Sequence, residues 1–395
     1  MDDMKHKRTY DAVICGYLCV DLVPIFKKHE GDAESEKLDF LRPGMLTELD
    51  GMTFTLGGLV GNTGLVLHKI GKNVVLNGLI GRDYLGEFVV RQLDKYEITG
   101  DIASTAAAGT AFGIVLAPPG VDRLFLESPG CSRLFGLDSV NAEVIADSKL
   151  LHFGYIPLLK QFFENGGEQL RELLETSQGS GTVTSMDLSL PDSAGETAGV
   201  DWRAILGRVL PFTDILLPSI EEILCMMMPD VYSELSQKYG GQHIIDHVSW
   251  ETLQRLGREL LAHGVKILMI KMAHRGVYLL TGDIATADGS GMLGLDVQAW
   301  SHQELFCEAY PLDETRAMNA SGAGDTAAAA FLAALLDGAP PASALKLSAM
   351  AGRQSLYCND LYTELASWDE ISENIDRETV NVLSMEDLLS RISIQ

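Results

Sequence analysis

Positive charge is scarce in this sequence. Its 395 residues include 55 Asp and Glu but only 30 Lys and Arg, which gives a formal net charge of -25 at pH 7. Proteins that bind nucleic acid need a basic face, so this balance argues against a nucleic-acid partner. An anionic substrate would also depend on local donors and cations, because the field of the whole chain repels it.

Paired cysteines, P-loops and long apolar runs are missing as well. The six cysteines are scattered without a Cys-x-x-Cys pair, which indicates reduced thiols rather than a disulfide framework or a metal site. The nearest approach to a P-loop, at residues 71–73, lacks the upstream glycine and the hydroxyl residue. No apolar run is long enough to cross a membrane. We therefore expect a cytoplasmic protein that does not associate with membranes.

Strand-like and helix-like segments alternate along most of the chain. From residue 149 onward, β-rich segments are followed by helical ones, as they are between residues 73 and 96. Such alternation predicts a parallel sheet with helices on both faces. No internal repeat or linker is visible, so we expect residues 1–395 to form one α/β domain. Residues 227–249 are interpreted as an insertion in it.

Three segments carry more specific expectations. Residues 10–23 are β-rich throughout and predict a single first strand with Asp21 near its end. The β-like runs 110–116 and 123–126 are separated by prolines and glycine, which predicts a hairpin. Residues 368–395 have the pattern of an amphipathic helix.

The stretch MNASGAGDTAAAAFLAALL, residues 318–336, joins two unlike halves. Its second half is apolar on every face, which predicts a buried helix. Gly322 and Gly324 would let an anion approach the exposed N–H groups at the start of that helix. Asp325 would then stand beside a phosphate as a base for an attacking hydroxyl group. On this stretch alone, an N-cap aspartate next to a tight glycine turn is an equally good interpretation.

The same stretch resembles the second signature of the ribokinase-like (phosphofructokinase-B type) carbohydrate kinases. The usual form of that signature is Asp-Thr-x-Gly-Ala-Gly-Asp before an alanine-rich helix. Other segments follow in the family's order: residues 57–62 (GGLVGN) resemble its sugar loop, and residues 216–222 (LLPSIEE) resemble its Asn-x-x-Glu region. Residues 271–280 (KMAHRGVYLL) resemble its nucleotide-side strand and turn. The resemblance covers roughly residues 10–373.

This resemblance implies a fold and a reaction. The fold is a three-layer α/β/α sandwich with a central, mostly parallel sheet and a small β lid, formed by about residues 22–56 and 108–128. In many relatives such a lid also forms a dimer interface, so a homodimer through the lid is one expectation. The reaction is transfer of the γ-phosphoryl group of ATP to a hydroxyl group of a sugar or sugar-like substrate, with Mg²⁺.

The resemblance also gives roles to individual residues. It implies Asp325 as the catalytic base, and the backbone of Gly322, Ala323, Gly324 and Asp325 as an anion hole. The other implied residues are Asp21, Gly57, Gly58 and Asn62 for the sugar, Ser219, Lys271, Ala273, Gly276 and Ser321 for the nucleotide, and Glu222 for Mg²⁺. The simpler alternatives are a turn residue at a strand end for Asp21, a helix cap for Asn62 and a solvated residue at a helix start for Glu222.

Departures from the family's pattern keep other functions open. Relatives hold a monovalent cation such as K⁺ near the position of Asn319, where Asp is usual, and Ser219 stands where the family has Asn. A nucleoside kinase would need stacking aromatic residues in the lid, and Phe112 and Phe125 are the candidates. A non-catalytic sugar or nucleotide sensor that keeps the fold is the third interpretation.

Overall fold

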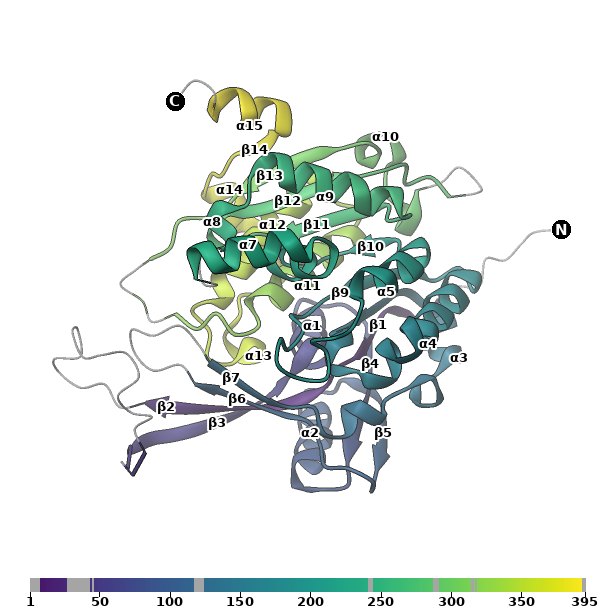
Figure 1. Cartoon of the computed structure of the whole chain (residues 1–395), viewed down its shortest axis with the longest axis vertical. Helices are drawn as coiled ribbons and strands as arrows, with labels where there is room; N and C mark the ends of the chain where they lie inside the picture. The colour runs from purple at the N-terminus through teal and green to yellow at the C-terminus, as the bar shows by residue number, and fades with distance from the viewer. Residues whose placement is uncertain are drawn as a thin grey trace.

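Two β-sheets of unequal size organise the chain in this computed structural model (Figure 1). The structure describes residues 8–26, 43–44, 46–116, 124–240, 244–286, 291–313, 316 and 318–392. Within these residues, ten strands form the large sheet in the spatial order β14 (Val382–Ser384), β13 (Glu304–Glu308), β12 (Gly276–Thr281), β11 (Ile267–Lys271), β10 (Ile215–Leu216), β9 (Val183–Asp187), β8 (Ser148–Gly154), β1 (Tyr10–Gly16), β4 (Val74–Gly81) and β5 (Thr99–Thr105). The described part of the small sheet has the order β3 (Leu49–Gly57), β2 (Cys19–Phe26), β6 (Phe112–Leu116) and β7 (Leu124–Ser128).

The large sheet is parallel through its centre and antiparallel at one edge. In the spatial order of the sheet, every neighbouring pair between β11 and the edge strand β5 is parallel. Strands β12, β13 and β14 continue the sheet beyond β11 as antiparallel strands. Successive residues of β11 enter different cores: Ile267 and Met269 enter one, and Leu268 and Ile270 the other. Alternate side chains of a strand point to opposite faces, so both faces of this sheet are covered.

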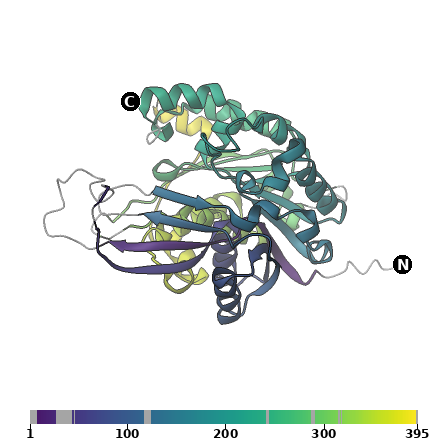
Figure 2. The same cartoon turned by 60° about the horizontal axis from the view of Figure 1, so that its bottom comes forward.

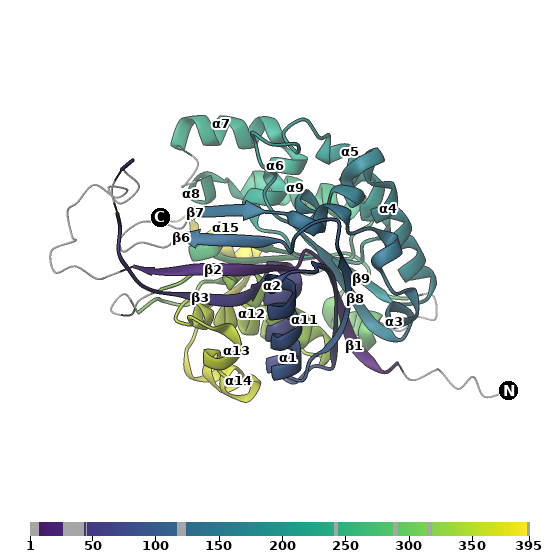
Figure 3. The same cartoon turned by 90° about the horizontal axis from the view of Figure 1, so that it is seen from below.

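Helices provide that cover. The α-helices of the described residues are α1 (Gly58–Lys69), α2 (Tyr84–Lys95), α3 (Ala142–Ala146), α4 (Lys160–Gly179), α5 (Trp202–Val209), α6 (Ile220–Met227), α7 (Pro229–Tyr239), α8 (Ile244–His247), α9 (Trp250–Ala262), α10 (Val297–Trp300), α11 (Ala323–Leu336), α12 (Pro341–Ser355), α13 (Leu361–Glu364), α14 (Trp368–Arg377) and α15 (Met385–Ile392). One face of the sheet packs against α1, α11, α12 and α14, and the other against α4, α5, α6 and α9 (Figure 3). The predicted three-layer α/β/α architecture is confirmed.

Helix α11 crosses the core, as its sequence predicts. Its residues from Asp325 to Leu335 are all buried. Alanine side chains occupy much of its surface, so α1 and α12 can pack closely against it. A charged residue at the start of such a helix is therefore held inside the protein.

The predicted single strand over residues 10–23 is wrong. Strand β1 ends at Gly16 and β2 begins at Cys19 in the other sheet. Gly16 has a φ of +129°, and a β carbon there would lie 2.5 Å from the carbonyl oxygen of Gly154. The chain therefore turns at this glycine from the large sheet into the small one, and Asp21 lies within a lid strand.

The predicted helix over residues 368–395 is also interrupted. Helix α14 ends at Arg377, and β14 and α15 follow it. Strand β14 adds to the edge of the large sheet beside β13. Pairing with an open sheet edge therefore decides the conformation of this segment, which local periodicity alone assigns to a helix.

The small sheet forms the expected β lid, which projects from the body of the molecule (Figure 2). The predicted hairpin is present as the antiparallel pair β6–β7, and β2 joins the two halves by pairing in parallel with β6. Parts of the predicted lid segments, residues 27–42, 45 and 117–123, lie outside the described residues. The interpreted insertion contains α7 and α8, and its residues 241–243 also lie outside them.

Candidate active site

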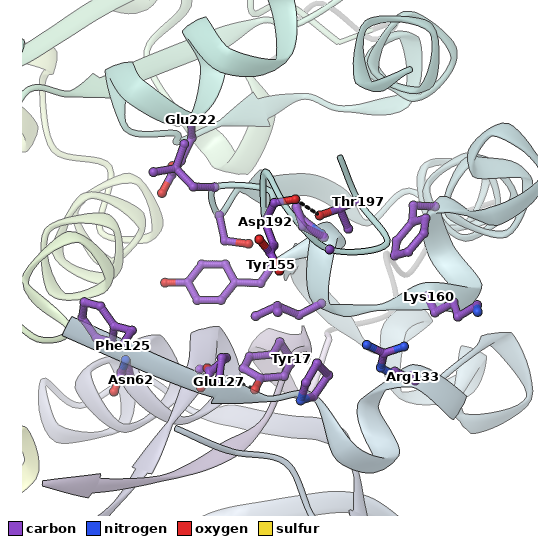
Figure 4. Close-up of a pocket in the computed structure, with 18 of the residues that line it drawn as sticks. Tyr17, Asn62, Phe125, Glu127, Arg133, Tyr155, Lys160, Asp192, Thr197 and Glu222 are labelled. Carbon is purple, nitrogen blue, oxygen red and sulfur yellow. Dashed lines mark hydrogen bonds between the residues drawn. The ribbon is translucent and has the colours of Figure 1, made fainter. Parts of the chain in front are cut away.

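A cavity of about 530 Å³ opens between the lid and the body, where the start of α11 meets the carboxyl ends of the parallel strands (Figure 4). Ligands of open α/β sheets bind at such strand ends. Its lining brings together Asp21, Gly58, Asn62, Glu222, Ser321, Gly322 and Asp325 from the predicted set. The other predicted residues are described but lie outside this lining: Gly57, Ser219, Lys271, Ala273, Gly276, Ala323 and Gly324.

The carboxylate of Asp325 is the most constrained group of the cavity wall. The side-chain amide of Asn62 donates to its Oδ2 at 2.9 Å, while Tyr155 and Thr63 donate to its Oδ1 at 2.7 and 3.4 Å. Asp325 is 4% exposed, and burial raises its pKa above the ordinary value although Lys271 and these hydrogen bonds oppose the rise. A buried carboxylate with fixed orientation suits proton transfer.

Two of the simpler interpretations are therefore wrong. The N-cap of α11 is Gly322, not Asp325, and the carboxylate of Asp325 accepts hydrogen bonds from side chains. Asn62 lies inside α1 rather than at its cap, and its amide reaches across to α11. Both residues face the cavity because two helices from distant parts of the chain pack side by side.

The start of α11 has the form of an anion site. Gly322 has a φ of +72°, and a β carbon there would lie 2.8 Å from the Leu361 side chain, so the turn needs glycine. The amide of Ala323 donates to the carbonyl of Ala320 at 3.2 Å, so it is less free than predicted. The amides of Gly324 and of the next residue belong to the first helical turn, which has no intrahelical acceptor for them.

Lys271 places a cation directly behind this helix start. Its Nζ lies 2.5 Å from the Asp187 carboxylate, and a β carbon on Gly324 would lie 3.7 Å from the same Nζ. Burial lowers the pKa of Lys271, but Asp187, Glu222 and Asp325 outweigh it and raise that pKa, so the ammonium group stays charged. The sequence around Asp325 shows no such cation, and the fold supplies it from the end of β11.

Glu222 is part of the helix start of α6 and of the cavity wall. Its Oε2 accepts from the amide of Ser219 at 2.7 Å, and the Ser219 hydroxyl accepts from the amide of Glu222 at 3.3 Å. This capping box fixes the side chain, and burial raises its pKa. Glu222 thus lies at a helix start, as the simpler interpretation has it, but its part-buried carboxylate is engaged by the amide of Ser219 instead of being free in solvent, and Ser219 has a structural role in placing it.

The turn after β11 contains one residue whose type the backbone explains. Gly276 has a φ of +117°, and a β carbon there would lie 2.0 Å from the carbonyl oxygen of Cys307 on β13. Ala273 adopts a left-handed φ of 46°. Close approach of strands thus explains this glycine without a nucleotide, and the predicted contact of both residues with a nucleotide stays a prediction.

A pair of carboxylates faces the cavity from the lid. Asp21 on β2 and Glu127 on β7 lie on either side of Gly113, where a β carbon would come within 3.0 Å of both side chains. A β carbon on Gly57 would lie 2.4 Å from the Asp21 carboxylate, so glycine at this position leaves room for it. Burial raises the pKa of Asp21 to about 6, and reduced hydration and the Asp21 charge raise the pKa of Glu127 to about 7.

Sequence reasoning missed two tyrosines and this glutamate. The Tyr17 hydroxyl donates to Glu127 at 3.1 Å, and the Tyr17 and Tyr155 rings stack with centroids 6.4 Å apart (Figure 4). Tyr17 and Tyr155 directly follow the glycines that end β1 and β8. Side chains at the carboxyl ends of parallel strands gather at one edge of the sheet, which is the signal that could have indicated them.

Comparisons with known proteins agree with the fold. A family model described as pfkB family carbohydrate kinase matches residues 16–365. A 5-dehydro-2-deoxygluconokinase of Clostridium perfringens is 22% identical over 382 residues, covering 95% of this chain and 96% of that protein.

Solved structures share the fold. A putative ribokinase II from E. coli in complex with ATP and Mg²⁺ has a TM-score of 0.64 at 17% identity, covering 93% of this chain and all of that one. Arabidopsis thaliana ribokinase complexed with ribose and ATP has a TM-score of 0.62 at 14% identity, covering 92% and 98% of the two chains.

The fold and the family match define a phosphotransferase that acts on an alcohol group. The chain belongs to the pfkB family of carbohydrate kinases, and it is a sugar kinase. No helix in the described ranges is long and apolar enough to cross a membrane.

Proposed function

We propose that this sugar kinase transfers the γ-phosphoryl group of ATP to a hydroxyl group of its acceptor in the cavity, with Asp325 as the catalytic base. The observation that carries the proposal is the buried Asp325 carboxylate at the start of α11, held by Asn62 and Tyr155. A hydroxyl group in the cavity would donate its proton to Asp325 while its oxygen attacks the γ-phosphorus and ADP leaves. Charge that develops on the transferred phosphoryl group would meet the amides of Gly324 and Asp325 and the nearby ammonium group of Lys271.

The residues of the site fit a magnesium ion held mainly by the nucleotide. Among the described residues, no group of three or more His, Cys, Asp or Glu could hold a metal by itself. Mg²⁺ keeps several waters and usually takes only one or two carboxylates besides the phosphates. Glu222, whose Oε2 is bonded to an amide, would hold the ion's waters with Oε1. When bound, the ion would neutralise phosphate charge.

Other parts of the proposal concern the nucleotide and the cations. Lys271, Ser219, Ser321, Ala273 and Gly276 are proposed to surround the ATP phosphates. Asn319 offers a neutral amide whose Oδ1 already accepts from the Ser321 amide at 3.0 Å. We therefore expect replacement of K⁺ in the assay to change kcat little.

The assembly and the location of the protein belong to the proposal as well. Ile25, Met52, Phe54 and Leu126 are large apolar side chains of the lid with about half of their surface exposed. They support a homodimer through the lid, which light scattering on the purified chain would test. We further propose that the protein works in the cytoplasm and binds no nucleic acid, which follows from its thiols and acidic charge.

The sugar acceptor has more support than a nucleoside acceptor. Phe125 lines the cavity, but Phe112, the second stacking candidate, does not. The names of the relatives point to different acceptors, a dehydro-deoxygluconate in one case and ribose in the other. They therefore leave the particular sugar open.

The test is ADP release with ATP and Mg²⁺ over a panel of sugars, sugar acids, polyols and nucleosides. Asp325→Asn is expected to lower kcat by about 10²- to 10⁴-fold, the range of a lost general base. Asp337→Asn is the matched control, because this exposed residue lies at the other end of the same helix. Ligand-induced stabilisation without turnover in the native chain would instead favour the sensor.

A further inference from the structure

The charges that line the cavity are unevenly distributed. Apart from Arg133 and Lys160, its charged lining residues are carboxylates: Asp21, Glu127, Asp192, Glu196, Glu222 and Asp325. Figure 4 shows Arg133 and Lys160 together at one end, and Asn62, which binds Asp325, at the other. In a protein with a net charge of -25, two cations at the end remote from the base form a local exception.

The two cations come from different elements and meet at one oxygen atom. Arg133 lies on the short 3-10 helix Gly130–Leu134 that follows lid strand β7, and Lys160 is the first residue of α4. An Arg133 Nη1 lies 2.7 Å from Glu196 Oε2, and the Lys160 Nζ lies 3.6 Å from the same atom. Arg133 also holds the pKa of Glu196 below its ordinary value. The resident carboxylate thus marks a point where a negative group is stabilised.

This resident pairing can be exchanged. The side chains of Arg133 and Glu196 are 44% and 50% exposed, and ion pairs this exposed contribute little to stability. An anionic group of a ligand could therefore replace Glu196 at little cost while the rest of the ligand binds in the cavity. Ser189 offers a further polar contact, because its hydroxyl oxygen is buried in the wall without a hydrogen-bond partner among the described residues.

We propose that the acceptor is an anionic sugar, with a carboxylate or a phosphate remote from the hydroxyl group that is phosphorylated, and that Arg133 and Lys160 bind this group in exchange for Glu196. The proposal rests on the proposed kinase reaction only for the position of that hydroxyl group near Asp325. Binding of the anionic end requires neither ATP nor a working base, so it is testable by itself.

The test compares anionic ligands with neutral counterparts that lack the anionic group. Calorimetric titration without ATP would use gluconate against glucitol for the carboxylate, and fructose 6-phosphate against fructose for the phosphate. At least one anionic probe is expected to bind about tenfold or more tightly than its neutral partner, because charge-assisted hydrogen bonds are the stronger kind. The member of the panel that shows the preference identifies which anionic group the site takes.

Variants at the anionic end should act in opposite directions. Arg133→Gln or Lys160→Gln is expected to weaken binding of the anionic probe about tenfold, and Arg133→Lys to retain part of it. Glu196→Gln is expected to tighten that binding up to about fivefold, because it removes the competing carboxylate. A folding defect cannot produce this tightening. Arg171→Gln is the matched control, since Arg171 pairs with Glu168 and Glu175 on the exposed side of α4.

Two results would overturn the proposal. One is equal binding of charged and neutral partners, or no binding of either anionic probe at about 10 mM, where even a weak specific site is occupied. The other is an unchanged affinity in both Arg133→Gln and Glu196→Gln. Turnover of neutral sugars alone would contradict the proposal of an anionic acceptor but would support the kinase reaction. Binding of an anionic probe that depends on Arg133, without ADP release, would support the anionic site but would contradict the kinase reaction.

Discussion

The Asp325 end of the cavity and the Arg133 end differ in how firmly their side chains are held. Asp325 is 4% exposed and is fixed by hydrogen bonds from helix α1 and from the end of β8. Arg133 and Glu196 are about half exposed; Arg133 lies on a short 3-10 helix, and Glu196 lies in the connection between β9 and α5. The difference agrees with the proposed division of roles, in which the packed core would fix the geometry of the chemistry and the lid and loops would select the acceptor.

The largest test of this comparison removes the cation behind α11. Lys271→Met leaves the Asp187 carboxylate buried without its partner, and breaking such a pair costs about 3–5 kcal/mol of unfolding free energy. Lys149→Met breaks an exposed pair with Asp11 and should cost about 0–1 kcal/mol. Urea unfolding of both variants measures the two costs. Similar values would mean that the Asp325 end is no more firmly built than the surface.

The lid carboxylates Asp21 and Glu127 should affect acceptor binding and protein stability in opposite directions as the pH changes. The pKa values of about 6 for Asp21 and about 7 for Glu127 predict that kcat/KM for the acceptor rises between pH 5 and 8, as both groups ionise. The stability of the fold changes with pH in the opposite direction. Because burial raises the pKa of Asp21, the contribution of Asp21 to the free energy of unfolding is present below about pH 4 and is lost as the pH rises through about 6.

Asp21→Asn should therefore lower kcat/KM and raise the melting temperature at pH 8 but not at pH 4. The stability gain is limited to about 3 kcal/mol, the equivalent of roughly two pKa units. Melting curves and pH–rate profiles of the variant and the native chain provide the measurement. A melting temperature that falls at pH 8 would show that Asp21 stabilises the lid rather than being held there for the ligand.

A smaller effect is expected where the lid meets α1. In Gly57→Ala the new β carbon would displace the Asp21 carboxylate, which should raise the KM for the acceptor by about 5- to 30-fold, the equivalent of 1–2 kcal/mol of overpacking. Gly179→Ala is the matched control, because no atom lies within 4 Å of its added β carbon. Steady-state kinetics on both variants measure the change in KM. An unchanged KM for Gly57→Ala would show that Asp21 does not bind the acceptor.

The smallest effect concerns one hydrogen bond on Asp325. Tyr155→Phe removes the donor to Oδ1, which should lower kcat by about 3- to 10-fold. The lost bond favours the ionised carboxylate, so the pKa of Asp325 should rise and the acidic limb of the kcat profile should move to higher pH. Tyr84→Phe, at an 85% exposed position, is the control. If the acidic limb of the kcat profile does not move in Tyr155→Phe, that limb reports the ionisation of a group other than Asp325.

The parts of the site that lie within one continuous motif could be predicted from the sequence. The glycine turn, Asp325 and the buried helix follow one another along the chain, and their residue types indicate the local backbone conformation. Asn62 and Glu222 are implied by the resemblance of their short segments to family motifs, and the structure brings them to the same cavity. The parallel sheet with helices on both faces followed from alternation alone.

Residues brought together only by the topology could not be predicted in this way. Tyr155, Glu127 and Arg133 belong to no motif. Tyr155 follows the end of β8, Glu127 lies within β7 and Arg133 lies on the 3-10 helix after β7, so only the packing of the lid against the body brings them to one cavity. The break between β1 and β2 was missed because β-favouring residues continue across Gly16, and only the neighbouring strand at Gly154 explains the turn. Strand β14 was missed because the open edge at β13, not its own sequence, makes it extended.

The hydrogen bond between Asn62 and Asp325 spans 263 positions of the chain. The ribosome makes the N-terminal part first, at about 5–20 residues per second, so the lid and helix α1 exist well before Asp325, the proposed base, does. An unfinished or prematurely terminated chain that stops before α11 therefore lacks both the proposed base and the proposed anion hole. Such a fragment would be catalytically silent, and the cell would not lose ATP to half-made copies of the enzyme.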